Sequence, residues 1–181
     1  MRAVIGAAVL GAACIAQPLA AQDKAGVFVE GLAGAAVPTF EIADAIGTGT
    51  AFGGTIGIRF GSWVTMAEFD YGMHDAERVE GVEISTQHYI AKIGYSVTGQ
   101  RDRGFEAIIN LGGGVVTFDV EDGDSYTYPA INAGAKLSYS FNPTFAVVLS
   151  PQGDIAFSDD EEVATSNAWV WPVTAGVRVS F

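Results

Sequence analysis

Few side chains in this sequence could do covalent chemistry, and its two histidines are the first to consider. A hydrolytic serine needs a histidine within hydrogen-bond reach and a carboxylate that orients that histidine. His74 and Asp75 fall in an expected loop with no serine nearby in the sequence, and His88 shares its strand face with Thr86 and Ile90. No glycine-rich phosphate loop, zinc spacing or nucleophile elbow is present. We therefore expect no enzyme and no catalytic residue.

Charged residues, by contrast, recur once in each of eight successive segments, and their signs alternate along the chain. They are Glu30, Arg59, Glu68, Lys92, Glu106, Lys136, Asp154 and Arg178. In a closed sheet Arg178 also lies beside Glu30, so each charge could have opposite charges on both neighbouring strands, with Glu68 and Asp154 somewhat higher than the rest. Unpaired charges are costly in a narrow, poorly hydrated interior. The pattern predicts an ion-paired ring that plugs the lumen.

Two further polar residues, Asp70 and His88, fall on the same face near the outer end of this ring. Histidine changes charge near physiological pH, so the pair could form a pH-sensitive gate. The alternative, which we favour, is that the ring neutralises charge for structural reasons and His88 is a hydrogen-bonded lumen residue.

The segments that must position these residues alternate polar and apolar side chains with a period of two, between glycine, proline or acidic residues. They cover 26–38, 51–60, 64–73, 84–96, 104–118, 128–140, 145–157 and 168–181. The aromatic residues of the apolar parity gather at the segment ends, as membrane interfaces favour, and a soluble β-sandwich has no reason to sort them in this way. The predicted fold is all-β, an eight-stranded antiparallel up-and-down transmembrane β-barrel.

Composition limits the alternatives. The chain has 181 residues, enough for one ordinary domain, and a formal charge of −12, the wrong sign for nucleic acid. Its one cysteine provides neither a disulfide framework nor a metal site, and we expect no cofactor and no metal. Mean hydropathy is +0.29, yet past the N-terminus no apolar run approaches the roughly 20 residues of a membrane-spanning helix.

The N-terminus has the pattern of a secretory signal peptide. Met1-Arg2 precedes an apolar stretch from Ala3 to Ile15, and small residues end at Ala21. We expect residues 1–21 to be a cleaved signal peptide and residues 22–181 to be the barrel domain. A lipoprotein signal at Cys14 is a weaker alternative, because the leucine expected three residues before the cysteine is absent.

The longer connections between the segments are strongly acidic, with fourteen acidic residues and one arginine. Two of these connections contain Asp119, Glu121, Asp122 and Asp124, and Asp159, Asp160, Glu161 and Glu162. This surface should attract a cationic partner and repel lipopolysaccharide phosphates unless divalent cations bridge the two. The first group departs from the EF-hand spacing, so a solvated acidic turn is the better interpretation than a metal site.

The chain ends in Val177-Arg178-Val179-Ser180-Phe181, a terminal aromatic residue with apolar residues at alternate positions. With the eight segments, this ending resembles the small outer-membrane barrels of Gram-negative bacteria, the OmpA/OmpX-like superfamily. The resemblance implies an outer-membrane location, a monomeric state, contacts with outer-membrane lipids and lipopolysaccharide, and recognition of Val177, Val179 and Phe181 by the barrel-assembly machinery. We expect a non-enzymatic structural or surface-interaction role.

Two alternatives remain at this point. One is a narrow channel for small solutes, ions or apolar compounds, as in OmpW-like barrels. The other is an enzyme that modifies lipid A, although the pattern of the lipid A deacylases, a histidine and a serine two residues apart on a lipid-facing strand, is absent.

Overall fold

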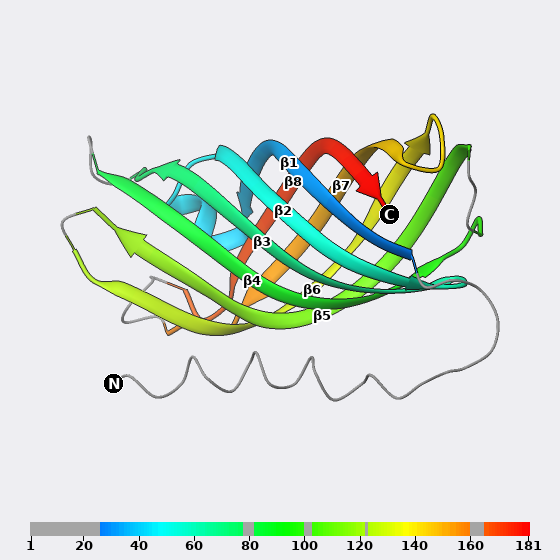
Figure 1. Ribbon diagram of the computed structural model, residues 1–181. Coiled ribbons are helices and arrows are strands. Elements are labelled where there is room, and N and C mark those ends of the chain that lie inside the picture. Colours follow the sequence, from blue (N-terminus) through cyan, green and yellow to red (C-terminus); the bar gives the residue numbers. More distant parts are fainter. Residues whose placement is uncertain (1–25, 78–81, 100–102, 122, 160–164) are drawn as a thin grey trace.

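The computed structural model describes residues 26–77, 82–99, 103–121, 123–159 and 165–181. Within them, eight antiparallel strands form one closed sheet, in which β1 pairs with both β2 and β8 (Figure 1). The strands are β1 (Gly26–Thr39), β2 (Gly49–Phe60), β3 (Trp63–Asp75), β4 (Glu83–Ser96), β5 (Gly104–Val120), β6 (Ser125–Ser140), β7 (Phe145–Ala156) and β8 (Ala168–Ser180). The predicted fold class is confirmed, whereas the expected signal peptide, residues 1–21, lies outside the described residues.

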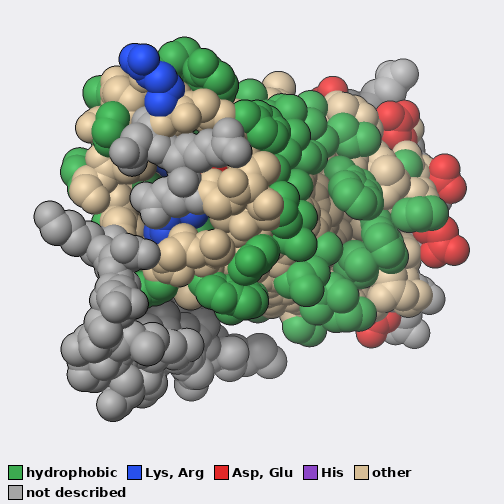
Figure 2. Space-filling model, turned by 90° about the vertical axis from the view of Figure 1, so that its right-hand side faces the viewer, with side chains coloured by type: hydrophobic (Ala, Val, Ile, Leu, Met, Phe, Trp, Pro, Cys, Tyr) green, Lys and Arg blue, Asp and Glu red, His purple; other side chains and the backbone are tan. Residues whose placement is uncertain are grey.

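The two faces of the sheet have opposite chemistry because successive side chains of a strand point to opposite sides. In β4, for example, Ile93 and Tyr95 are exposed on the outer face while Ile90 and Lys92 are buried inside. The exposed apolar side chains form a broad belt around the barrel, and acidic side chains gather at one end (Figure 2). A surface of this kind suits a hydrocarbon environment rather than water.

Aromatic pairs mark the two edges of this belt. Near the end of the long connections, Phe40 and Trp169 make an edge-to-face contact with centroids 5.2 Å apart. Near the opposite end, Trp63 and Tyr95 make an edge-to-face contact with centroids 5.1 Å apart. Aromatic rings are favoured at the level of lipid headgroups, so these pairs bracket the membrane-embedded part of the wall.

The connection between β1 and β2 folds back into the mouth of the barrel. It contains a short 3-10 helix, η2 (Phe40–Asp44), which appears as a coil beside the strand ends in Figure 1. Ile42 and Ile46 are buried, whereas Glu41 and Asp44 remain exposed. No helix in the described part of the chain is long and apolar enough to cross a membrane.

Candidate functional site

The lumen is the candidate site, because all eight predicted ring residues and both predicted gate residues point into it. Each of these ten side chains belongs to a residue that is at most 7% exposed. They are buried because successive side chains of a strand point to opposite faces of the sheet. The apolar side chains face lipid, so the polar side chains of all eight strands share one narrow interior.

Lys136 occupies the centre of the lumen. Its Nζ atom lies 2.6 Å from Glu30 Oε2 and 2.6 Å from Glu68 Oε2, and it also donates a hydrogen bond to Thr55. Glu68 forms a second ion pair with Lys92. One buried ammonium group thus connects carboxylates from β1 and β3, on two sides of the barrel.

The same chain of contacts continues toward the inner end through two arginines. Arg178 Nη2 lies 2.7 Å from Glu30 Oε1, and Arg178 Nη1 lies 3.4 Å from Glu106 Oε2. Arg59 Nη2 lies 2.8 Å from that same oxygen of Glu106. The guanidinium carbon of Arg178 also stands 4.5 Å from the centre of the Phe28 ring, a cation–π contact. Seven of the eight ring residues therefore form one continuous network.

The contacts in this network differ from the expected ring of neighbours. Within the network only Lys92 with Glu68 and Arg178 with Glu30 are pairs on adjacent strands, and its other four ion pairs cross the lumen. The physical reason is reach, since long lysine, arginine and glutamate side chains span a lumen as narrow as that of an eight-stranded barrel. Glu68 belongs to the network through its contacts with Lys92 and Lys136.

Asp154, the eighth ring residue, stands apart with the predicted gate residues. Its Oδ2 accepts a hydrogen bond of 2.8 Å from His88 Nδ1, and its Oδ1 accepts one of 2.7 Å from Asn132. Asp70 lies opposite His88 in the β3–β4 ladder. Asp70 Oδ1 and His88 Nε2 have no hydrogen-bond partner among the described residues. The structure brings Asp70 and His88 to the same level without a direct hydrogen bond between them in the described contacts.

Apolar clusters lie toward both ends of the charged network, a feature that the sequence analysis missed. At the outer end, Ile42 and Ile46 of the folded-back connection pack with Ile90, Val116 and other inward-facing side chains. The inner-end cluster consists of Phe28, Val64, Met66 and Ile108. A signal was present in the sequence, because Ile42 and Ile46 are the two large aliphatic residues of an acidic connection and lie four residues apart.

His74 was expected in a loop, and this is wrong: it is the penultimate residue of β3 and its side chain is buried. Its Nδ1 donates to the carbonyl oxygen of Gly47 at 2.8 Å, and its Nε2 lies 3.3 Å from Thr86 Oγ1. The absence of a side chain at Gly49 and Gly72 makes room for the ring, since a Cβ at either position would lie 2.9 Å from one of its nitrogens. His74 thus ties the β1–β2 connection to the barrel mouth.

The acidic connections lie at the outer end, where Asp119, Glu121, Asp124 and Asp159 are exposed. Asp122, Asp160, Glu161 and Glu162 were predicted for the same surface and fall outside the described residues. Among the residues that are described, no group of three or more His, Cys, Asp or Glu side chains could hold a metal ion.

The C-terminal residues of the predicted assembly signal lie on the lipid side of β8 or just beyond it. Val177 and Phe181 are exposed, and Val179 is half-buried. The backbone N–H of Phe181 donates to Val27 O at 2.8 Å, so the terminal residue extends the β1–β8 ladder.

Comparisons with known proteins agree with this architecture. Residues 5–181 match the family described as the outer membrane protein beta-barrel domain. A search of curated proteins found no match. Neisserial surface protein A has a similar structure at 15% identity, with a TM-score of 0.69, covering 87% of this chain and 100% of that one.

Two further solved structures share the fold. The N-terminal β-barrel domain of Pseudomonas aeruginosa OprF is 18% identical, with a TM-score of 0.54, and the match covers 88% of this chain and 100% of that one. Ail, the attachment invasion locus protein of Yersinia pestis, was solved with the heparin analogue sucrose octasulfate. It is 14% identical, with a TM-score of 0.50 and coverage of 88% and 100%.

A closed eight-stranded barrel with a lipid-facing apolar belt and a polar lumen defines a small outer-membrane β-barrel. The chain belongs to the outer membrane protein beta-barrel domain family.

Proposed function

We propose that this protein is a non-enzymatic outer-membrane barrel with a closed lumen, which acts through its acidic outer connections. In this proposal residues 1–21 direct export and residues 22–181 form the mature barrel. The observation that carries it is the continuous network of seven buried charges, from Lys92 through Lys136 to Arg59, that crosses the lumen. A path for solutes would have to break several of these ion pairs at once.

Energetics favour a network that stays closed. Removing one partner from a buried ion pair typically costs about 3–5 kcal/mol, because the other charge is left buried and uncompensated. Apolar clusters also pack in the lumen toward each end of the network. Support for a non-enzymatic role comes from the two histidines, whose described hydrogen bonds go to Gly47, Thr86 and Asp154 and not to a serine.

The test is single-channel conductance of the purified, refolded protein in a planar bilayer, with a heat-modifiability gel to show that it is folded. We expect a folded protein without reproducible current. A reproducible current that changes in Lys92→Gln or Glu106→Gln would overturn the closed lumen and identify a narrow channel.

The second part of the proposal concerns the partner. Every charged residue described in the outer connections, from Glu41 to Asp159, is acidic, so the complementary partner is cationic. Ail was solved with a sulfated saccharide, and a ligand of that charge is disfavoured here. Lipopolysaccharide would need bridging divalent cations at this surface, whereas the apolar belt contacts lipid chains directly.

Binding of an oligolysine peptide tests this idea, with sucrose octasulfate as the anionic comparison. Neutralising the run 159–162 with amides should weaken oligolysine binding by about tenfold. The matched control exchanges Asp and Glu within the same run, which keeps the charge, and should bind as wild type does. Equal binding by both variants, or preferential binding of sucrose octasulfate, would contradict an electrostatic contact at this surface.

A further inference from the structure

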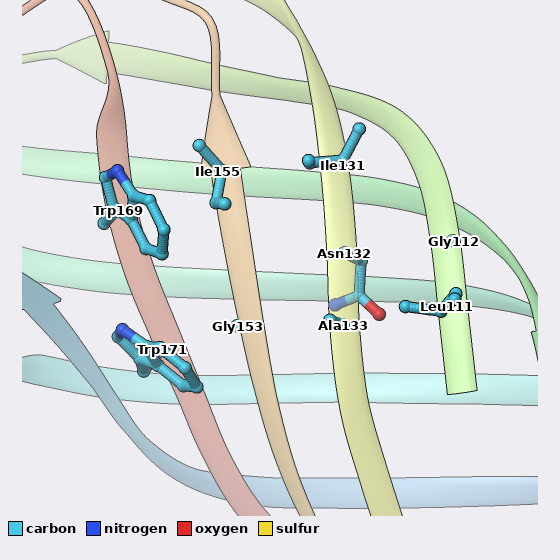
Figure 3. Close-up of a pocket in the computed structure, with 9 residues that line it drawn as sticks. All are labelled: Leu111, Gly112, Ile131, Asn132, Ala133, Gly153, Ile155, Trp169 and Trp171. Carbon is cyan, nitrogen blue, oxygen red and sulfur yellow. The ribbon is translucent and has the colours of Figure 1, made fainter. Parts of the chain in front are cut away.

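The lipid-facing wall has a hollow of about 310 Å³ that crosses β5, β6, β7 and β8 (Figure 3). Its lining is apolar apart from the lumen residue Asn132, whose side-chain amide already donates to Asp154. We propose that this hollow is a binding site for one acyl chain of a membrane lipid, distinct from the general lipid contact of the belt.

Strand register explains why the wall is hollow at this place. One row of outward-facing residues runs from Leu111 to Ala133 and on to Gly153, so two small residues follow one another on β6 and β7. In the next row toward the outer end, Ile131 pairs with Ile155, and both carry large side chains. Ala133 and Gly153 thus form the floor of the hollow, and Figure 3 shows them between the larger residues Trp171 and Leu111.

The tryptophans on β8 complete the wall, and contacts with the last residue of β1 and the first residue of η2 hold them in place. The Trp171 ring leans over Gly153, where a Cβ would lie 2.8 Å from the ring. Its Nε1 donates to Thr39 Oγ1 at 3.1 Å, and the Trp169 ring makes an edge contact with Phe40 at a centroid distance of 5.2 Å. The hollow is therefore formed before any ligand arrives, which reduces the ordering cost of binding.

The shape of the hollow favours an acyl chain over a second barrel. It is continuous with the apolar belt, and a single chain can enter a recess whose floor is one or two residues wide. The wall of another barrel is convex and would bridge the recess without filling it. Binding within a membrane depends on close packing, because lipid and protein surfaces are equally apolar, and a preformed recess provides that packing.

Native mass spectrometry can test this site on protein purified from membranes, with dimyristoyl phosphatidylcholine as the probe. Ala133→Leu fills the floor from the lipid side, and Ala91→Leu makes the same change on the exposed face of β4, outside the hollow. Wild type and Ala91→Leu should each retain one lipid per chain, and Ala133→Leu should reduce its occupancy by about tenfold.

A heat-modifiability gel shows whether both variants fold, and Ala133→Gly, which leaves the floor open, serves as a second variant that should keep the lipid. Equal occupancy in the two leucine variants would overturn the proposal. So would a dimer mass in place of a lipid adduct.

Discussion

A single lysine holds the middle of the lumen together. Lys136 is 0% exposed and lies within 2.6 Å of carboxylate oxygens of both Glu30 and Glu68. Those carboxylates also face Arg178 and Lys92, so the charge of each is shared between two cations. Substitution of Lys136 should destabilise the network more than substitution of a residue at either end, because removing this group weakens both halves at once.

Replacement of Lys136 by methionine should therefore lower the free energy of unfolding by about 3–5 kcal/mol, the usual cost of one uncompensated buried charge. Adding Glu68→Gln to Lys136→Met should recover part of the loss, because the remaining charges balance again. Urea unfolding in vesicles, compared at constant m-value, measures both effects. Unchanged stability in Lys136→Met would show that the network does not stabilise the fold.

The described lumen contains five carboxylates but four lysine and arginine side chains, so one carboxylate lacks a permanent counter-charge. Asp70 is the candidate, because its Oδ1 has no partner among the described residues whereas Asp154 accepts hydrogen bonds from His88 and Asn132.

Replacement by asparagine should consequently change the free energy of unfolding in opposite directions at the two aspartates. Asp70→Asn should raise the free energy of unfolding by roughly 1–3 kcal/mol, since it removes a buried carboxyl group that has no counter-charge, at constant volume. Asp154→Asn should lower the free energy by a similar amount, because it removes the charge that His88 contacts. The same urea titration compares them, and a loss of stability in Asp70→Asn would refute the charge assignment.

At the scale of elements, β7 is the strand with the most interrupted pairing. Phe141 N–H donates to Phe145 O and Phe157 N–H to Pro129 O, so the alternation of an antiparallel ladder would make Ala135 and Pro151 a hydrogen-bonded pair. The β6–β7 register lacks this pair, because it passes from Gly134–Gln152 to Leu137–Leu149. Pro151 has no N–H to donate to Ala135 O. The side chain of Gln152 replaces it, because its Nε2 donates to Ala135 O at 3.0 Å.

Gln152→Ala should lower the free energy of unfolding by about 1–3 kcal/mol, because Ala135 O loses its donor and Lys92 loses an acceptor. Pro151→Val in that background should recover part of the loss by restoring the backbone N–H. Pro151→Val alone, in which Gln152 still donates to Ala135 O, serves as the control and should change the free energy of unfolding less.

Strands could be predicted from the sequence because their period-two pattern is local, and all observed boundaries lie within three residues of the predicted ones. η2 could not be predicted, since the burial of Ile42 depends on the barrel mouth that β4, β5 and β6 create. For the same reason the residues of the charge network could be named but not their partners. Strand order predicts which strands are adjacent, whereas Lys136 contacts residues of β1 and β3 across the lumen.

The whole molecule is asymmetric along the barrel axis. Acidic residues gather at the end where β1 finishes and η2 closes the mouth, while short turns such as 141–144 join the strands at the other end. In an outer-membrane barrel the short turns face the periplasm and the longer connections face the outside. The two ends of β6 are therefore expected on opposite sides of the membrane.

Epitope insertion at the two ends of β6 tests this orientation within one strand. An epitope inserted after Gly123, in the turn before β6, should bind antibody on intact cells. The same epitope inserted after Asn142, in the turn after β6, should bind antibody only when the outer membrane has been permeabilised. Both turns lie outside the apolar belt, so neither insertion disturbs the lipid-facing wall, and heat modifiability checks that each variant folds. The reverse pattern of labelling would place the acidic connections in the periplasm, where a cationic partner from outside the cell could not reach them.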